Sequence, residues 1–140
     1  MKRSANAAWK GGLKDGRGTV STESGAVSSV PYTFGMRFEN EKGTNPEELV
    51  AAAHAACFSM ALSLFMANEG LTPESIETSC TVGFENINGA WTVTESHLQT
   101  KVKSANADPA KFQKAADGAK AGCPISRLLN AKTTMDATLA

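Results

Sequence analysis

Three cysteines offer the most reactive side chains of this sequence, and each lies in a different local setting. Cys57 lies within an apolar stretch, with His54 three residues earlier and therefore beside it on a helix surface. The thiolate is the reactive form of cysteine, so a neighbouring base or cation could activate Cys57. Taken alone, Cys57 is more typical of a buried, unreactive thiol, and His54 of a hydrogen-bonded core histidine. The local pattern leaves both interpretations open.

The other two cysteines have different predicted positions. Cys123 directly precedes Pro124, which suits the first position of a helix, so Cys123 falls at a predicted N-cap. Backbone N–H groups and the helix dipole favour a thiolate there, although a small residue fitting a tight turn explains Cys123 equally well. Cys80 alternates with Ile76 and Val82, which predicts a structural thiol on the apolar face of a strand.

Composition excludes several classes of function. Fourteen Lys and Arg balance fourteen Asp and Glu, which gives no electrostatic reason to expect a nucleic acid or an anionic membrane as partner. No CxxC or HxxxH spacing supports a metal site. Three cysteines cannot form a fully paired disulfide framework, and residues 1–12 lack the apolar core of a signal peptide. We expect a soluble, reduced, cytoplasmic protein.

Charged residues near these cysteines could support a reactive thiol. Glu47 and Glu48 are explained well as first-turn residues of a helix, and Arg37 as a solvated arginine of a strand. Beside a reactive cysteine, however, a guanidinium lowers the pKa of the thiol and can hydrogen-bond a peroxide oxygen. A carboxylate would then hold the guanidinium in place.

The elements that position these residues suggest one α+β domain over residues 1–140, with antiparallel strands and one dominant helix. Alternation from Tyr32 to Phe38 predicts a half-buried strand that carries Arg37 on its second face. Asn88 and Gly89 predict a hairpin turn. Strands are predicted at residues 5–10, 18–22, 32–38, 76–84 and 91–103, with a last one in the tail. Shorter helices are predicted at residues 108–120 and 124–130.

The dominant helix begins after Asn45, a good N-cap followed by Pro46, and ends near Gly70. Residues 49–67 are nineteen largely apolar residues, long enough to span a membrane. Seven of them are alanine, a histidine lies inside, and no Lys or Arg follows closely on either side. A helix that is apolar all round is otherwise buried all round, and one small sheet covers only one side of it. The sequence therefore predicts a homodimer.

Three stretches strongly resemble the OsmC/Ohr family of thiol peroxidases: "GTVSTESG", "RFENEKGTNPEELVAAAHAACFSMALS" and "AKAGCPIS". The resemblance runs from about Gly18 to the C-terminus. It implies an OsmC-like fold, with an antiparallel sheet wrapped around a long central buried helix in an intertwined homodimer. It also implies reduction of organic hydroperoxides, and less selectively of hydrogen peroxide, in oxidative or osmotic stress defence.

The resemblance assigns roles to particular residues. Cys57 matches the peroxidatic cysteine and Cys123 the resolving cysteine, although the helix-dipole argument alone favours Cys123 as the thiol of lower pKa. Arg37 and Glu47 match the residues that activate the thiolate, whereas the Ohr branch takes its arginine from a segment near Arg17. The implied cycle passes through a Cys57–Cys123 disulfide that an external dithiol reduces. That reductant is of the lipoyl type, and no organic cofactor or metal is required.

The spacing of Glu47 and Cys57 suggests which subunit supplies the carboxylate. Ten residues along one straight helix correspond to roughly 15 Å, too far for Glu47 to act on the thiol of its own chain. Two such helices crossing near Ala52 would bring Glu47 beside the partner's Cys57. The alternatives to an enzyme are a redox-sensing or small-ligand binding dimer without efficient turnover, and a structural dimer with inert thiols.

Overall fold

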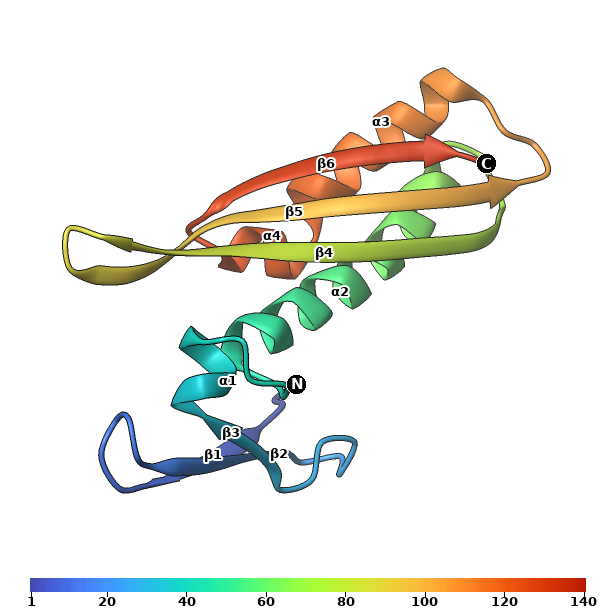
Figure 1. The fold of residues 1–140 in the computed structure, drawn as a ribbon. Coiled ribbons are helices and arrows are strands. Elements are labelled where there is room, and N and C mark those ends of the chain that lie inside the picture. The colour runs from blue at the N-terminus through green and yellow to red at the C-terminus, as the bar shows by residue number, and fades with distance from the viewer. The chain divides into compact units, whose positions relative to one another are not determined.

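The computed structural model describes residues 1–140, and these form two compact units, Met1–Leu49 and Val50–Ala140. The first unit contains an antiparallel sheet of order β1-β2-β3 (Figure 1). Its elements are β1 (Ala5–Lys10), β2 (Arg17–Thr22), β3 (Val30–Thr33) and the short helix α1 (Phe34–Phe38). The helix α2 (Pro46–Asn68) begins in this unit and continues in the second. The first two strands agree with the sequence prediction to within one residue.

In the first sheet, the rings of Trp9 and Tyr32 lie close to each other over Gly18. Gly18 of β2 pairs with Trp9 on one neighbouring strand and with Tyr32 on the other. The two ring centroids lie 5.4 Å apart. A Cβ atom on Gly18 would lie 2.5 Å from the Tyr32 ring and 2.7 Å from the Trp9 ring. Because no side chain fits between the rings, this position requires glycine.

The predicted strand at residues 32–38 is wrong beyond Thr33, where the chain enters α1. Thr33 is the N-cap, and its Oγ1 accepts a hydrogen bond from the Met36 N–H at 3.2 Å. Phe34 and Phe38 lie one helical turn apart, with ring centroids separated by 4.8 Å. Large apolar residues at every second position are typical of a strand, but the Thr33 cap and the contact between Phe34 and Phe38 favour a helix.

The helix α2 has the ends that the sequence predicts. At its start, Asn45 Oδ1 accepts a hydrogen bond from the Glu48 N–H at 2.8 Å. At its end, Gly70 adopts a φ of +75°. The Leu71 N–H then bonds to the Met66 carbonyl at 2.8 Å, which completes a Schellman motif.

The second unit contains a sheet of order β4-β5-β6. Its strands are β4 (Pro73–Ile87), β5 (Ala90–Ser104) and β6 (Lys132–Leu139). The first two pair in an antiparallel manner through a turn in which Asn88 and Gly89 both have positive φ, as the hairpin signal predicts. A register shift between Gly83 and Phe84 interrupts the alternation of the two faces.

The last strand differs from the antiparallel arrangement expected from the sequence, because β6 pairs in parallel with β5. Two helices, α3 (Pro109–Gly122) and α4 (Pro124–Leu128), lie between these strands and return the chain along the sheet. They agree with the predicted helices to within two residues at each end, and Asp108 caps α3 as its Oδ1 accepts from the Lys111 N–H.

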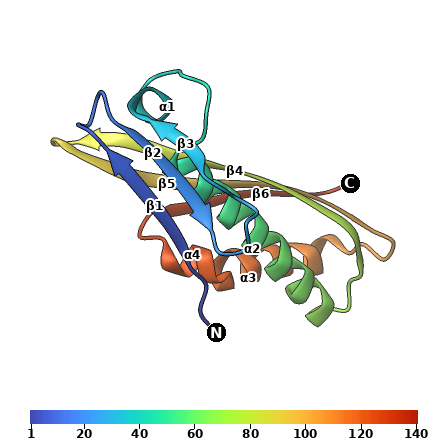
Figure 2. The ribbon, with the colours of Figure 1, turned by 90° about the horizontal axis from the view of Figure 1, so that it is seen from below.

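The core of the second unit lies between one face of the sheet and the helices α2 and α3 (Figures 1 and 2). Every fourth residue of α2 is buried there: His54, Phe58, Leu62 and Met66. Close packing against α3 places the Phe65 ring where a Cβ on Gly118 would lie, at 2.6 Å. The opposite face of α2 is apolar but exposed in one chain, with Met60 77% and Leu64 60% accessible. A single chain therefore covers only one side of this helix, as the sequence predicts.

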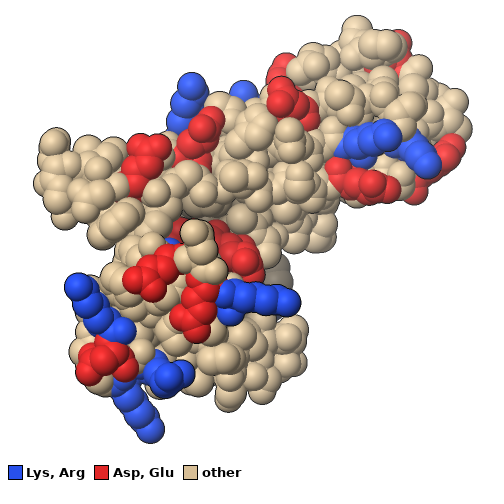
Figure 3. Space-filling view, in the orientation of Figure 1, with Lys and Arg blue, Asp and Glu red and all other residues tan.

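The surface charge matches the balanced composition. On the face drawn in Figure 3, acidic and basic side chains are interspersed in both units, and no broad patch of a single sign forms. By length and composition, α2 is the one helix that could cross a membrane. Its regular burial of one residue per turn against the sheet is that of a core helix.

Candidate active site

The thiols of Cys57 and Cys123 lie in direct contact. Their Sγ atoms are 2.9 Å apart, with Cys123 as the donor, although the residues are 66 positions apart in the sequence. Cys57 is half-buried in the middle of α2, and Cys123 is fully buried. Neither is in a disulfide, so the structure describes the reduced pair. A dithiol this close needs little movement to form a bond.

Cys123 lies at the junction of two helices. Its N–H bonds to the Ala119 carbonyl and so ends α3, while its own carbonyl accepts from the Arg127 N–H at 3.0 Å and begins α4. The predicted N-cap position is therefore correct. However, the backbone of Ile125 in the first turn of α4 hydrogen-bonds the Cys57 thiol. The N-terminus of α4 thus directs an N–H group at Cys57. From the sequence, this stabilisation of a thiolate was expected for Cys123 alone.

The pKa of the Cys57 thiol is raised, first by burial and then by the hydrogen bond it shares with Cys123. The backbone hydrogen bond from Ile125 opposes this change, because it favours the thiolate. The surroundings of Cys57 within the second unit therefore hold it mainly as a thiol at neutral pH. A reactive Cys57 needs a further positive charge.

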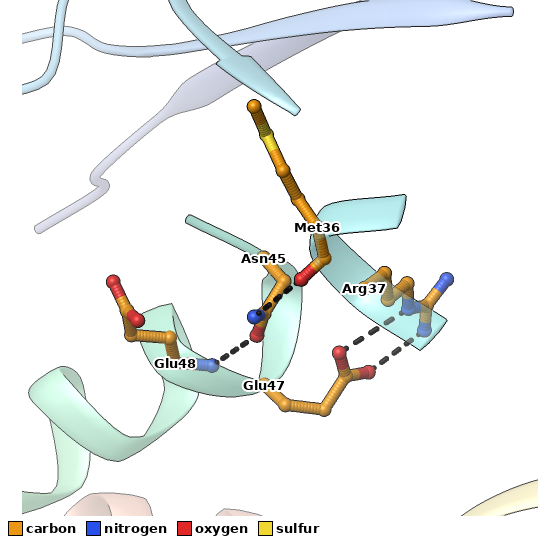
Figure 4. Close-up of polar contacts among 5 residues, drawn as sticks. All are labelled: Met36, Arg37, Asn45, Glu47 and Glu48. Atoms are coloured by element: carbon orange, nitrogen blue, oxygen red, sulfur yellow. Dashed lines mark hydrogen bonds and ion pairs between the residues drawn. The ribbon is translucent and has the colours of Figure 1, made fainter. Parts of the chain in front are cut away.

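Arg37 and Glu47 form a bidentate ion pair in the first unit (Figure 4). The arginine Nε donates to Glu47 Oε2 at 3.2 Å, and Nη2 donates to Oε1 at 2.8 Å. The arginine side chain is 35% exposed and the glutamate 12%. Two parallel hydrogen bonds fix the plane of the guanidinium.

The helix ends that carry this pair are tied to each other. Asn45, the N-cap of α2, donates through Nδ2 to the Met36 carbonyl of α1 at 3.1 Å (Figure 4). This places the last turn of α1, which carries Arg37, against the first turn of α2, which carries Glu47. Glu48 points elsewhere and accepts from Thr44 Oγ1 at 3.2 Å.

Arg17, the alternative arginine, has a different setting. It lies exposed on β2, paired in register with Thr33, and makes no ion pair. A hollow of about 480 Å³ lies beside Arg17, Lys10 and Asp15, and another of about 260 Å³ lies beside Arg37. The remaining lining of this second hollow is mostly aromatic: Trp9, Leu13, Tyr32, Thr33, Phe34 and Phe38.

Near the thiol pair lies a buried polar cluster that the sequence did not predict. His54 is fully buried, and its Nδ1 and Nε2 atoms lie 2.7 Å from the hydroxyls of Ser96 and Ser126 respectively. Cys80 reaches the same cluster, with its Sγ 3.1 Å from Ser96 Oγ. Burial lowers the pKa of His54 and raises the pKa of Cys80, the latter opposed by Ser96. The available signal was spacing, since His54 precedes Cys57 by three residues and Ser126 follows Cys123 by three.

No group of three or more His, Cys, Asp or Glu side chains in the structure is arranged to hold a metal ion. Cys80 lies half-buried on the packed face of β4. Its assignment as a structural thiol stays a prediction.

Comparison with known proteins agrees with the resemblance seen in the sequence. A sequence profile described as OsmC-like protein matches residues 39–138. The chain is 47% identical to Peroxiredoxin OsmC of Escherichia coli, over 97% of this chain and 95% of that protein. It is 30% identical to an organic hydroperoxide resistance protein of Xanthomonas axonopodis, over 92% of this chain and 89% of that one. An OsmC-like protein from Mycoplasma pneumoniae has the same fold, with a TM-score of 0.76, 17% identity, and coverage of 100% and 98%.

The contacting thiols and these relationships define a cysteine-based peroxidase. The α+β, OsmC-like fold predicted from the sequence is confirmed. The chain belongs to the OsmC-like family. The long apolar helix packs as a core helix of the second unit, with His54, Phe58, Leu62 and Met66 buried.

Proposed function

We propose that this protein reduces organic hydroperoxides, and hydrogen peroxide less selectively, through a two-cysteine cycle. Cys57 acts as the peroxidatic cysteine and Cys123 as the resolving cysteine. The observation that carries this proposal is the 2.9 Å contact between their Sγ atoms, which brings together residues from α2 and from the α3–α4 junction. The names of the relatives, a peroxiredoxin and an organic hydroperoxide resistance protein, support the same reaction.

The reaction follows from thiol chemistry. The Cys57 thiolate attacks the distal peroxide oxygen, the O–O bond breaks, and the leaving alkoxide takes a proton and departs as an alcohol. Cys57 becomes a sulfenic acid. The Cys123 sulfur then attacks the Cys57 sulfur, so that an S–S bond forms, the S–O bond breaks and water leaves. An external dithiol of the lipoyl type restores both thiols by exchange, and no organic cofactor or metal takes part.

Arg37 supplies the positive charge that Cys57 needs, and Glu47 orients it. Burial raises the pKa of Cys57, and a guanidinium near the thiol lowers it. The bidentate hydrogen bonds from Arg37 to Glu47 support this role, since they fix the orientation of the guanidinium. The aromatic hollow beside Arg37 suits the apolar part of an organic hydroperoxide better than it suits hydrogen peroxide.

The active form is an intertwined homodimer in which both units of each chain work as one domain. The exposed apolar face of α2 supports the dimer, because alanines together with Met60 and Leu64 would otherwise stay in water. In this dimer, Arg37 and Glu47 of one chain lie beside Cys57 of the partner and activate it. This arrangement removes the difficulty that Glu47 and Cys57 of one chain are ten residues apart along the same helix. The protein acts in the cytoplasm, in oxidative or osmotic stress defence.

Steady-state consumption of peroxide with a dithiol reductant tests the proposed function. Many equivalents should be consumed per subunit, and an organic hydroperoxide should be consumed faster than hydrogen peroxide. Consumption of a single equivalent would favour the alternative of a redox sensor. Failure to form a sulfenic acid at Cys57 would favour a structural dimer with inert thiols.

The role of Arg37 predicts a change in the pKa of Cys57. In a chain that lacks Cys80 and Cys123, Arg37→Met should raise this pKa by about one, or about 1.4 kcal/mol of lost preference for the thiolate. The measurement is the alkylation rate of Cys57 against pH, whose midpoint should move upward. Arg17→Met is the matched control and should leave the midpoint in place. The opposite pattern would assign the role to Arg17.

A further inference from the structure

The start of α4 contacts α2 at two points one helical turn apart. At the first point, the Cys123 thiol and the backbone of Ile125 both hydrogen-bond Cys57. At the second point, Ser126 Oγ lies 2.7 Å from Nε2 of His54. Because His54 precedes Cys57 by three residues, both contacts lie along the same side of α2. The position of α4 therefore decides what surrounds the Cys57 thiol.

The His54 ring is held firmly enough to serve as an anchor. It is fully buried, and its second nitrogen, Nδ1, lies 2.7 Å from Ser96 Oγ in β5. Burial lowers the pKa of His54, so the ring is neutral at pH 7. A neutral imidazole donates through one nitrogen and accepts through the other, so the two serine hydroxyls satisfy it completely. The ring thus links the sheet, α2 and α4.

Few other interactions hold α4. The helix has five residues, none of them fully buried, and Ile125 alone packs partly against the core. Among the side chains of α4, only that of Ser126 makes a hydrogen bond, the one to His54, beside the backbone hydrogen bond from Ile125 to Cys57. A helix this short gains little stability from its own backbone. Loss of the hydrogen bond between Ser126 and His54 should therefore loosen α4 more than it would loosen a long helix.

From this geometry we infer that His54 is a positioning residue for the resolving step, and that it acts through Ser126. By holding α4 against α2, it keeps the Cys123 sulfur next to Cys57 after Cys57 has been oxidised. This inference rests on the proposed roles of the two cysteines. It gives a function to a buried histidine that takes no part in the attack on peroxide.

The consequence is a choice between two fates of the Cys57 sulfenic acid. Attack by Cys123 forms the S–S bond and releases water. If Cys123 is displaced, the sulfenic acid meets a second hydroperoxide instead, which transfers one oxygen to the sulfur and leaves as an alcohol. The product is then a sulfinic acid, which dithiols do not reduce. Close placement of Cys123 favours the disulfide.

The ratio of disulfide to sulfinic acid at a fixed hydroperoxide concentration tests this inference. Mass spectrometry of Cys57 measures the ratio, which does not depend on the rate of the first attack. Ser126→Ala should lower it about five- to tenfold, as expected for loss of one buried hydrogen bond. Ser126→Thr keeps the hydroxyl and should restore the ratio. Ser59→Ala is the matched control, because the Ser59 hydroxyl on α2 bonds Thr78 at 2.9 Å and the Ala55 carbonyl, and no residue of α4.

A second variant tests whether Ser126 acts together with His54. His54→Gln should lower the ratio of disulfide to sulfinic acid as Ser126→Ala does. The double variant should lower this ratio no further than either single variant. If Ser126→Ala matches Ser59→Ala while the unaltered protein forms the Cys57–Cys123 disulfide, the inference is overturned and the proposed function stands. If the unaltered protein forms no such disulfide, both are overturned.

Discussion

Replacement of Cys57 by serine should abolish hydroperoxide reduction, whereas Cys123→Ser should consume about one equivalent per subunit and then stop. The two outcomes differ because, in the proposed cycle, Cys57 attacks the peroxide, whereas Cys123 converts the resulting sulfenic acid into a disulfide. The Cys123 variant should stall as a sulfenic acid after the first equivalent, and only a second equivalent in excess peroxide should take it to the sulfinic acid. Peroxide consumption and mass spectrometry of the cysteine peptides measure both results.

Cys80→Ser provides the control for this pair. Cys80 has the same chemical group and lies half-buried on β4, where it contacts Ser96. Its removal should leave turnover nearly intact. If the Cys80 variant loses activity and the Cys57 variant keeps it, the assignment of the peroxidatic cysteine is wrong.

A mixed dimer of one Cys57→Ser subunit and one Glu47→Gln subunit should recover about half of the activity of the unaltered dimer, as the proposed two-fold symmetric dimer requires. Each homodimer of these variants should be nearly inactive. In the mixed dimer, one site combines the intact Cys57 of one chain with the intact Glu47 and Arg37 of the other. Coexpression with two different tags and purification through both isolates the mixed dimer.

The expected recovery depends on the ion pair within one chain. Arg37 donates two hydrogen bonds to Glu47 of its own chain. In the proposed dimer, Glu47→Gln therefore loosens the guanidinium that this chain places beside Cys57 of the partner. Glu48→Gln is the matched control, since Glu48 is the next residue and contacts Thr44 instead. That homodimer should keep its activity. Absence of recovery in the mixed dimer would place Glu47 in cis to Cys57, or outside the site.

Elements with strong local signals could be predicted from the sequence. The ends of α2 followed from Asn45 and Gly70, because a side-chain cap and a positive φ are properties of single residues. The β4–β5 hairpin followed from Asn88-Gly89 for the same reason. The segment from Phe34 to Phe38 was predicted wrongly, because alternation and helical spacing both fit so short a run, and the cap at Thr33 decided between them.

The site was predictable only in part, for a different physical reason. The catalytic roles predicted for Cys57 and Cys123 came from the family resemblance, because their local sequence patterns alone left inert thiols as an alternative. The contact between His54 and Ser126 joins residues 72 positions apart, and their matching three-residue spacings from Cys57 and Cys123 predict it only once the two cysteines are known to meet. The hydrogen bond from Ile125 to Cys57 involves the backbone, which every residue possesses, so residue type carries no signal for it.

The parallel pairing of β6 with β5 makes α3 and α4 the crossover of a β-α-β unit, and Cys123 lies inside that crossover. Such a pairing closes only when the whole connection, residues 105–131, has been placed, and pairing over long sequence separations is slow. During synthesis, the contact between Cys57 and Cys123 therefore forms only after Cys123 has been added and the last strand has paired. A chain that stops before β6 retains every residue of the site but lacks the strand that ends the crossover. The site is thus among the last features of the protein to assemble.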